Sequence, residues 1–299
     1  MRLSLTPSLF SLPAFTAAAL ALGSAYAVDL TPLGGKIRSE NGVPVELSCD
    51  TDAFTAADYR LIGQCVTLKK LNLNGKTLTD ETLPLLAGLS ALEEFTTNGS
   101  QLSDEGYRHF AAFSQLRVLN LWHPSFGKAG FTGAGLIHLK GLAQLERLTF
   151  AGATAGDEAL AAIGQLGQLR FFQTWHTAQT QAGNAHLTKL SHLTRLKIGQ
   201  RLPKWGTDSA PSFDASTIPV LARITSLEEL ELFEARLTFT DLEPLKGLPH
   251  LKKLSIHTCD IAEADIAKLR AALGDRVAVE FKPLSPEDRV ATLEKKLRL

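Results

Sequence analysis

The sequence has few of the residues that build covalent frameworks or reactive sites. Its 299 residues include three cysteines, one methionine and three tryptophans. Lysine plus arginine and aspartate plus glutamate are balanced at 31 each, so the chain has neither an acidic tail nor the basic field that attracts nucleic acid or anionic membranes. We therefore expect no nucleic-acid partner.

Signatures of catalysis are also missing. The sequence contains no Gly-x-Ser-x-Gly elbow, no His-Glu-x-x-His motif and no phosphate-binding loop. Glu229 and Glu231 are spaced to share one face of a strand, as paired glycosidase acids could, but no pocket wall is apparent around them. We therefore expect a protein that is not an enzyme and that needs no cofactor.

Only one long apolar run is present, and it lies at the N-terminus. Leu9–Gly23 is rich in alanine and leucine, and Ala25-Tyr26-Ala27 then places small residues where a signal peptidase reads them. The alternative is an uncleaved anchor, because residues 3–27 are nearly long enough to span a bilayer. Pro7 and Pro13 and the cleavage site favour a signal peptide over residues 1–27, and hence export to the periplasm or the medium.

The rest of the chain repeats a Leu-x-x-Leu-x-Leu frame. The frame begins at Leu68, Leu92, Leu116, Leu145, Leu169, Leu193, Leu227 and Leu251. Successive starts are separated by 24, 24, 29, 24, 24, 34 and 24 residues. A fixed period in the twenties with this frame predicts a solenoid in which each unit packs on its neighbours.

The segments after the strands carry a resemblance to a known family. Leu78-Thr79-Asp80 and Leu102-Ser103-Asp104-Glu105-Gly106, and more loosely residues 262–266, resemble the bacterial 24-residue type of leucine-rich repeat. The resemblance implies an α/β solenoid, a horseshoe with a parallel concave sheet and short convex helices. It also implies a role in binding rather than catalysis.

The domain boundaries follow from the frame. Residues 28–67 are expected to form an entry segment and N-terminal cap, with a loop over 28–41 and a first strand over 43–47 that tolerates Pro44 because it is an edge. Residues 68–276 hold eight repeats. Residues 277–299 hold a last strand and a helix that starts at Ser285-Pro286, serving either as a C-terminal cap or as an oligomerisation helix.

Three cysteines cannot all pair with one another. Cys259 occupies a small inward position of its repeat and is expected to be a buried thiol. Cys49 and Cys65 could form a disulfide in an exported cap. Their expected places, after a strand and after the following helix, lie at opposite ends of one coil, so two core thiols remain the alternative.

Alternation along each strand identifies the side chains of the concave face. Such positions are normally polar, yet Trp122, Phe171, Trp175 and Phe233 are aromatic. Five extra residues within His123–Phe131 and ten within Gly199–Asp214 leave from strand carboxyl ends, so both insertions lie on one rim.

The aromatic positions and the insertions together predict a partner-binding site. Its residues are Trp122, His123, Phe171, Trp175, His176, Arg195, Lys197 and Trp205. The alternative is that these aromatics only pack against the inserted loops. No metal site is expected, because His123 and His176 lie two strands of about 4.8 Å apart, whereas zinc ligands lie about 2.1 Å from one point.

The expected partner is a protein or peptide, since the rim combines aromatics with charges of both signs. A glycan is the main rival, because rim tryptophans can stack on sugar faces. A third possibility is an envelope scaffold that docks through its C-terminal helix.

Overall fold

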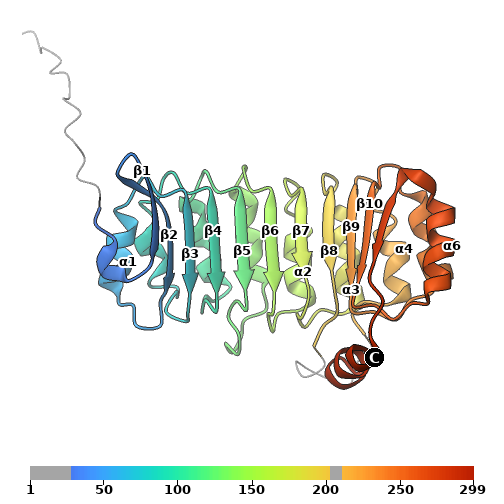
Figure 1. Ribbon diagram of the computed structural model, residues 1–299. Coiled ribbons are helices and arrows are strands. Elements are labelled where there is room, and N and C mark those ends of the chain that lie inside the picture. The colour runs from blue at the N-terminus through green and yellow to red at the C-terminus, as the bar shows by residue number, and fades with distance from the viewer. Residues whose placement is uncertain (1–27, 203–210) are drawn as a thin grey trace, which may run out of the picture.

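The computed structural model describes residues 28–202 and 211–299. The expected signal peptide and Trp205 therefore lie outside the described residues. Eleven strands form one sheet in chain order, and every neighbouring pair is parallel except β1 and β2 (Figure 1). The strands are β1 Lys36–Glu40, β2 Val43–Asp50, β3 Lys70–Asn74, β4 Glu94–Asn98, β5 Val118–Trp122, β6 Arg147–Ala151, β7 Phe171–Thr174, β8 Arg195–Ile198, β9 Glu229–Phe233, β10 Lys253–His257 and β11 Ala278–Phe281.

The pairing register confirms the repeat frame that the sequence predicts. Val118 of β5 pairs with Glu94 of β4 and with Arg147 of β6, so the five extra residues leave the register unchanged. Arg195 of β8 pairs with Glu229 of β9 across the longer insertion in the same way. Both insertions therefore leave the sheet at strand carboxyl ends. We call the side of the solenoid where the strands end the carboxyl-end rim.

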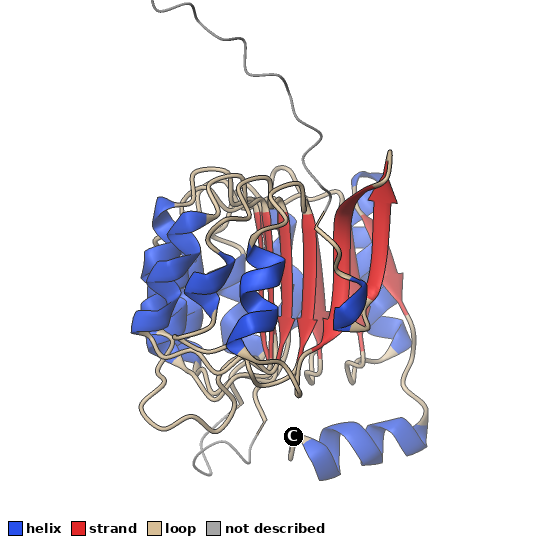
Figure 2. Ribbon diagram, turned by 90° about the vertical axis from the view of Figure 1, so that its left-hand side faces the viewer, coloured by secondary structure: helices blue, strands red, loops and turns tan. Residues whose placement is uncertain are grey.

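Short helices return the chain behind the sheet. Figure 2 shows them on one side of it, and among the described residues no helix lies over the other side, which we call the open face. The α-helices are α1 Ala56–Gly63, α2 Asp157–Ile163, α3 Gln181–Asn184, α4 Ile218–Leu221, α5 Phe239–Leu242, α6 Glu263–Leu273 and α7 Pro286–Asp288. The 3-10 helices are η1 Thr31–Leu33, η2 Leu83–Leu86, η3 Glu105–Ala112, η4 Ala134–Gly141, η5 Ala185–Lys189, η7 Ala215–Thr217, η8 Glu243–Gly247 and η9 Gly274–Arg276, and η10 Arg289–Lys296 is a π-helix.

The frame leucines form the core between the sheet and the helices. Leu116, Leu119 and Leu121 of one repeat are fully buried, as are Leu145 and Leu148 of the next. Full burial of a leucine side chain contributes about 1.5–3 kcal/mol, and no single repeat could bury these faces alone. The stack of repeats is therefore the main source of stability.

Aspartates after several of the strands connect one repeat to the next. The sequence predicts that Thr79-Asp80 caps the segment that follows it. Thr79 Oγ1 does accept a hydrogen bond from Glu81 N at 3.3 Å, but Asp80 reaches the next repeat instead. Its carboxylate accepts a hydrogen bond from Ser103 N of the following repeat at 2.8 Å. Asp104 likewise accepts from Gly135 N at 3.0 Å. A Cβ on Gly135 would lie 1.8 Å from Asp104 O, so this close approach requires glycine.

The N-terminal cap differs from the expectation. The predicted loop over residues 28–41 contains η1 and β1, and β1 pairs antiparallel with β2. The outer edge of the sheet is therefore β1, so Pro44 of β2 does not lie on an edge. Pro44 faces Ser39, beside the register shift between Arg38 and Ser39. An irregular pairing accommodates a residue without an N–H group.

All three cysteines are free and buried. Cys65 Sγ lies 3.9 Å from Pro44 O, near the start of β2, whereas Cys49 lies near the end of that strand. This separation is the physical reason why the two do not pair. Burial raises the pKa of Cys49 to about 11 and that of Cys259 to about 12, so both are weak nucleophiles.

The C-terminal helix formed by α7 and η10 lies beneath the carboxyl-end rim (Figures 1 and 2). Ser285 caps it, because its side chain accepts a hydrogen bond from Asp288 N. Leu293 and Leu297 are buried, and Arg289 pairs with Asp260 at 2.8 Å. The segment thus docks on turns at the strand ends.

Candidate partner-binding face

Large and small residues alternate along the last outward position of the strands. Trp122, Trp175 and Phe233 are half-buried, whereas the intervening Ala151 and Gly199 are buried. A Cβ on Gly199 would lie 3.0 Å from the Cβ atoms of both Trp175 and Phe233. The small residues therefore leave room for rings from every second repeat to meet above them.

The rings form a continuous row that we call the aromatic row: Trp122, Trp175, Phe233 and His257. Trp122 and Trp175 meet edge to face with centroids 5.4 Å apart. Trp175 and Phe233 stack at 6.2 Å and 18°, and Phe233 and His257 stack at 5.2 Å and 28°. Such pairs contribute about 0.5–1.5 kcal/mol beyond their burial, so the rings support one another while each stays partly exposed.

Lys197 joins the aromatic row to the charged part of the open face. Its Nζ lies 5.0 Å from the Trp175 ring centroid and 4.2 Å from that of Phe233. The same atom lies 3.4 Å from a carboxylate oxygen of Glu231. The ammonium group is therefore held between two rings and an acid.

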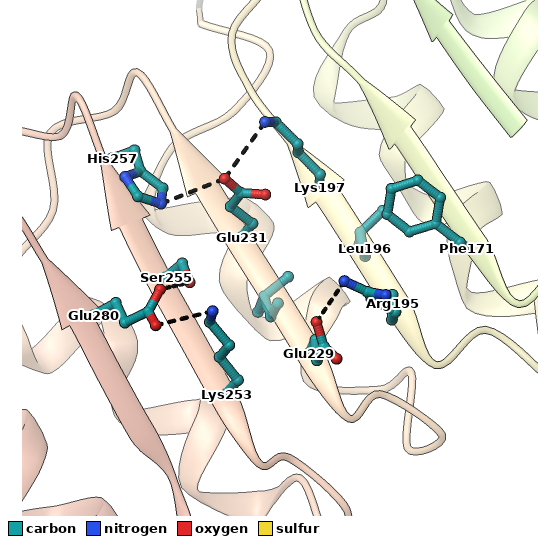
Figure 3. Close-up of a pocket in the computed structure, with 11 residues that line it drawn as sticks. Phe171, Arg195, Leu196, Lys197, Glu229, Glu231, Lys253, Ser255, His257 and Glu280 are labelled. Atoms are coloured by element: carbon teal, nitrogen blue, oxygen red, sulfur yellow. Dashed lines mark hydrogen bonds and ion pairs between the residues drawn. The ribbon is translucent and has the colours of Figure 1, made fainter. Parts of the chain in front are cut away.

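A hollow in the open face extends from Phe171 of β7 to Glu280 of β11 (Figure 3). Its charges alternate in sign from strand to strand, because cations on β8 and β10 face acids on β9 and β11. The ion pairs are Arg195–Glu229 at 2.9 Å, Lys197–Glu231 at 3.4 Å, His257–Glu231 at 3.4 Å and Lys253–Glu280 at 2.9 Å. The hydrogen bond from Lys253, followed by that from Ser255, lowers the pKa of Glu280. The positive and negative side chains that line the hollow therefore largely balance one another.

Phe171, at the edge of this hollow, lies between two arginines. The guanidinium carbon of Arg147 on β6 lies 4.7 Å from the ring centroid, and that of Arg195 on β8 lies 5.5 Å from it. Arginine stacks on aromatic rings through its planar guanidinium. The ring therefore orients both cations on the open face.

The N-terminal half of the open face carries a hydrogen-bonded ladder along the last outward positions of its strands. Asn74 Nδ2 donates to Asp50 Oδ1 at 2.8 Å, and Asn98 Nδ2 donates to Asn74 Oδ1 at 2.9 Å. His123 Nδ1 lies 2.8 Å from Asn98 Oδ1. We call Asp50, Asn74, Asn98 and His123 the amide ladder.

His176 belongs to a different cluster, on the carboxyl-end rim. Its Nε2 lies 2.9 Å from the carboxylate of Glu234, which is only 7% exposed. Lys296 of the C-terminal helix lies 3.7 Å from Glu234 and 3.5 Å from His176 Nε2. The imidazole of His176 therefore already has polar partners within this chain.

The structure brings together five of the eight predicted site residues: Trp122, Phe171, Trp175, Arg195 and Lys197 lie on one part of the open face. His123 and His176 lie one position further, on the rim, where they contact separate partners. Trp205 is outside the described residues. Whether these residues bind a partner stays a prediction.

Three further residues complete this part of the open face, and the sequence reasoning did not include them in the site. Phe233 and His257 extend the aromatic row, and Arg147 stacks on Phe171. The sequence contains the information needed to include them, because all three occupy outward positions of the repeat frame.

Within residues 28–202 and 211–299, no group of three or more His, Cys, Asp or Glu side chains is placed to hold a metal ion. Over the same residues, no helix has the length and apolar character needed to cross a membrane.

Comparisons with known proteins give similarity at the level of structure. No protein-family model matches the sequence, and no curated protein matches it. An internalin C2 from Listeria monocytogenes is 17% identical, with a TM-score of 0.45 over 78% of this chain and 84% of that one. An internalin from the same species is 16% identical, with a TM-score of 0.34 over 80% and 87%.

A third solved structure, a complex of TLR13 with the RNA ssRNA13, is 16% identical, with a TM-score of 0.49 over 81% of this chain and 33% of that one. The fold rests on the chain's own geometry: Leu-x-x-Leu-x-Leu frames in register, one strand per repeat and short helices on one side. The chain is a leucine-rich repeat solenoid.

Proposed function

We propose that this is an exported, non-enzymatic binding protein that recognises a protein or peptide through its open face and the carboxyl-end rim of its third to sixth repeats. The aromatic row carries this proposal. Four ring-bearing side chains lie in contact on a sheet face that no helix of the described part of the chain covers. Rigid aromatic anchors next to arginine and lysine are typical of binding hot spots.

The pairing of the charged side chains supports binding rather than catalysis. Glu229 and Glu231 each lie within reach of a cation, Arg195 and Lys197 respectively. A general acid or base works with a group whose proton affinity is tuned and whose oxygen can reach a substrate. Surface carboxylates that pair with cations on the neighbouring strand are better suited to shaping a binding face than to acid–base catalysis.

A glycan remains the second candidate, and the amide ladder favours it. Asn74 and Asn98 lie near Trp122, which combines amide groups with an aromatic face as sugar recognition requires. The scaffold alternative has less support, because Leu293 and Leu297 of the C-terminal helix are buried against this chain.

The proposal is tested by affinity capture with the mature protein from residue 28 onward as bait. The Trp122→Ala, Trp175→Ala double variant is expected to lose the captured partner, because hot-spot residues each contribute about 2 kcal/mol or more. Val66→Ala is the matched control, since this exposed apolar side chain lies in the turn before β3.

Circular dichroism and the thermal midpoint establish that each variant is folded. A Trp122→Phe, Trp175→Phe variant keeps most of the ring packing, so it separates a loss of binding from a loss of structure. Equal recovery by wild type and a folded double variant would contradict the proposed site. The glycan would be favoured if the wild type captures no protein but binds a glycan on an array and the double variant loses that binding.

A further inference from the structure

The charged side chains on the open face are paired almost without exception. On the parallel strands β2 to β11, Lys70 pairs with Glu94 at 2.9 Å, and the cations of β8 and β10 pair as described above. Arg147 is the one open-face cation on these described strands with no carboxylate within 4.0 Å. The preceding acid, Glu146, pairs instead with Arg117 at 3.0 Å.

Arg147 is also exposed and held in place. Its guanidinium carbon lies 4.7 Å from the centroid of the Phe171 ring, and a guanidinium held over a ring face can still donate from its N–H groups. Thr149 and Ala151, the next outward residues of β6, are buried, so the strand forms a low point between its neighbours. An oriented guanidinium loses less side-chain freedom on binding than a mobile one.

The surroundings match a peptide that carries one acid. Beyond Thr149 along the same strand, Trp122 and Trp175 meet above Ala151, which offers an apolar surface. Because a strand rises about 3.3 Å per residue, this surface lies roughly 13 Å from Arg147. A short extended peptide can reach both places.

We propose that Arg147, oriented by Phe171, receives an Asp or Glu side chain of the peptide partner. The inference rests on the proposed function and names the chemistry of its partner. A carboxylate accepts two parallel hydrogen bonds from a guanidinium, which gives direction as well as affinity. Arg195 on the far side of Phe171 is already bound to Glu229, so it shapes the site without competing for the acid.

A nucleic acid fits the same surface less well. Binding of nucleic acid depends on several phosphates neutralised at once. Here the cations around Arg147 are balanced by Glu229, Glu231 and Glu280, so the open face presents little uncompensated positive charge.

The test uses a phage library of random 12-residue peptides, selected on the full mature protein. We expect the selected peptides to be enriched in Asp or Glu. A synthetic peptide of the consensus sequence is then labelled, and its Kd is measured by fluorescence anisotropy. For Arg147→Gln we expect the Kd to rise about tenfold or more, since hydrogen bonds to charged groups are the strong ones.

Lys70→Gln is the matched control, because it removes one positive charge from the open face at a cation that already has a partner. Its Kd should change less than about twofold. Replacing the peptide acid by Gln should weaken binding to the wild type but add nothing in Arg147→Gln, which is the signature of a direct pair in a double-mutant cycle.

The outcomes separate the inference from the function on which it rests. Selection of peptides without enriched acids, or an unchanged Kd for Arg147→Gln, would overturn the acidic-peptide inference and leave peptide binding intact. Failure to select any peptide would overturn both. Displacement of the peptide by an equal concentration of a 12-nucleotide single-stranded RNA would overturn the inference in favour of a phosphate backbone.

Discussion

At the scale of single residues, the position after each strand adopts a left-handed backbone in most repeats. The residues and their φ values are Gly75 139°, Gly99 88°, His123 45°, Gly152 72°, His176 52°, Glu234 59° and Thr258 53°. There the chain leaves the sheet while its N–H still bonds to the next repeat, as His123 N does to Ala151 O at 2.8 Å. Non-glycine residues tolerate this conformation at a cost of about 1–2 kcal/mol.

Thr258 shows this strain without an evident gain. A β-branched residue at positive φ is an outlier, so Thr258→Gly should raise the free energy of unfolding by up to about 1 kcal/mol, after the greater chain entropy of glycine is deducted. Chemical denaturation measures the change.

Glu234→Gly is the matched comparison, because it relieves the same backbone conformation. It also removes the buried carboxylate that His176 and Lys296 contact, so we expect it to destabilise the protein by at least about 1 kcal/mol. A stabilised Glu234→Gly variant would show that these contacts contribute little.

Part of the candidate site follows from the sequence, and part does not. The two-residue period places Trp122, Phe171 and Trp175 on one face without a structure. The same frame sets Arg195 opposite Glu229, so the lateral ion pairs were also readable. The cluster of His176 and Lys296 was not, because 120 residues separate them and no repeat rule relates them.

At the scale of elements, the two ends of the chain depart from the repeat rules. The first strand of the N-terminal hairpin, Lys36–Glu40, lies in the segment where Pro32, Gly34 and Gly35 predict a loop. This strand is mostly polar, because an exposed outer strand needs no apolar face. The start of the C-terminal helix was readable from Ser285 and Pro286. Its docking place was not, since it depends on tertiary contacts of Leu293 and Leu297.

The C-terminal helix should behave as a separately docked element. The Leu293→Ala, Leu297→Ala variant removes its buried anchors, and burial losses of about 2–5 kcal/mol per leucine should release it from the rim. We expect amide exchange in residues 285–299 to rise strongly while the repeats stay protected, because solenoid units depend on their immediate neighbours.

Val290→Ala is the control, since Val290 is 38% exposed. It should leave exchange in the helix unchanged. A large fall in the thermal midpoint of the whole protein after loss of Leu293 and Leu297 would instead mean that the helix is part of the cooperative core.

At the scale of the whole molecule, the period alone predicted the architecture. Each repeat contacts its neighbours, so the eight frames determine the order and direction of β3 to β10. The same list of outward residues divides the last outward position of the strands into a row of amides in the N-terminal half and a row of aromatic side chains in the C-terminal half. The period does not predict which of these side chains a partner contacts.

The amide ladder extends across this N-terminal half, and its direction has a consequence for His123. An ionised Asp50 can only accept, so Asn74 must donate to it, Asn98 must donate to Asn74, and Asn98 Oδ1 is left as an acceptor. Neutral His123 must then carry its proton on Nδ1, with the lone pair on Nε2. A carboxylate roughly 14 Å away, at about 4.8 Å per strand, thus selects the tautomer.

Nitrogen-15 NMR of the imidazole checks this. The wild type should show the Nδ1–H tautomer, and Asp50→Asn, which lets the amides reverse their direction, should yield a mixture of both. An unchanged tautomer in Asp50→Asn would show that Asn98 alone sets it. If the mixture appears, a change of charge on β2 is transmitted along the amide ladder and determines the position of a proton three strands further along the solenoid.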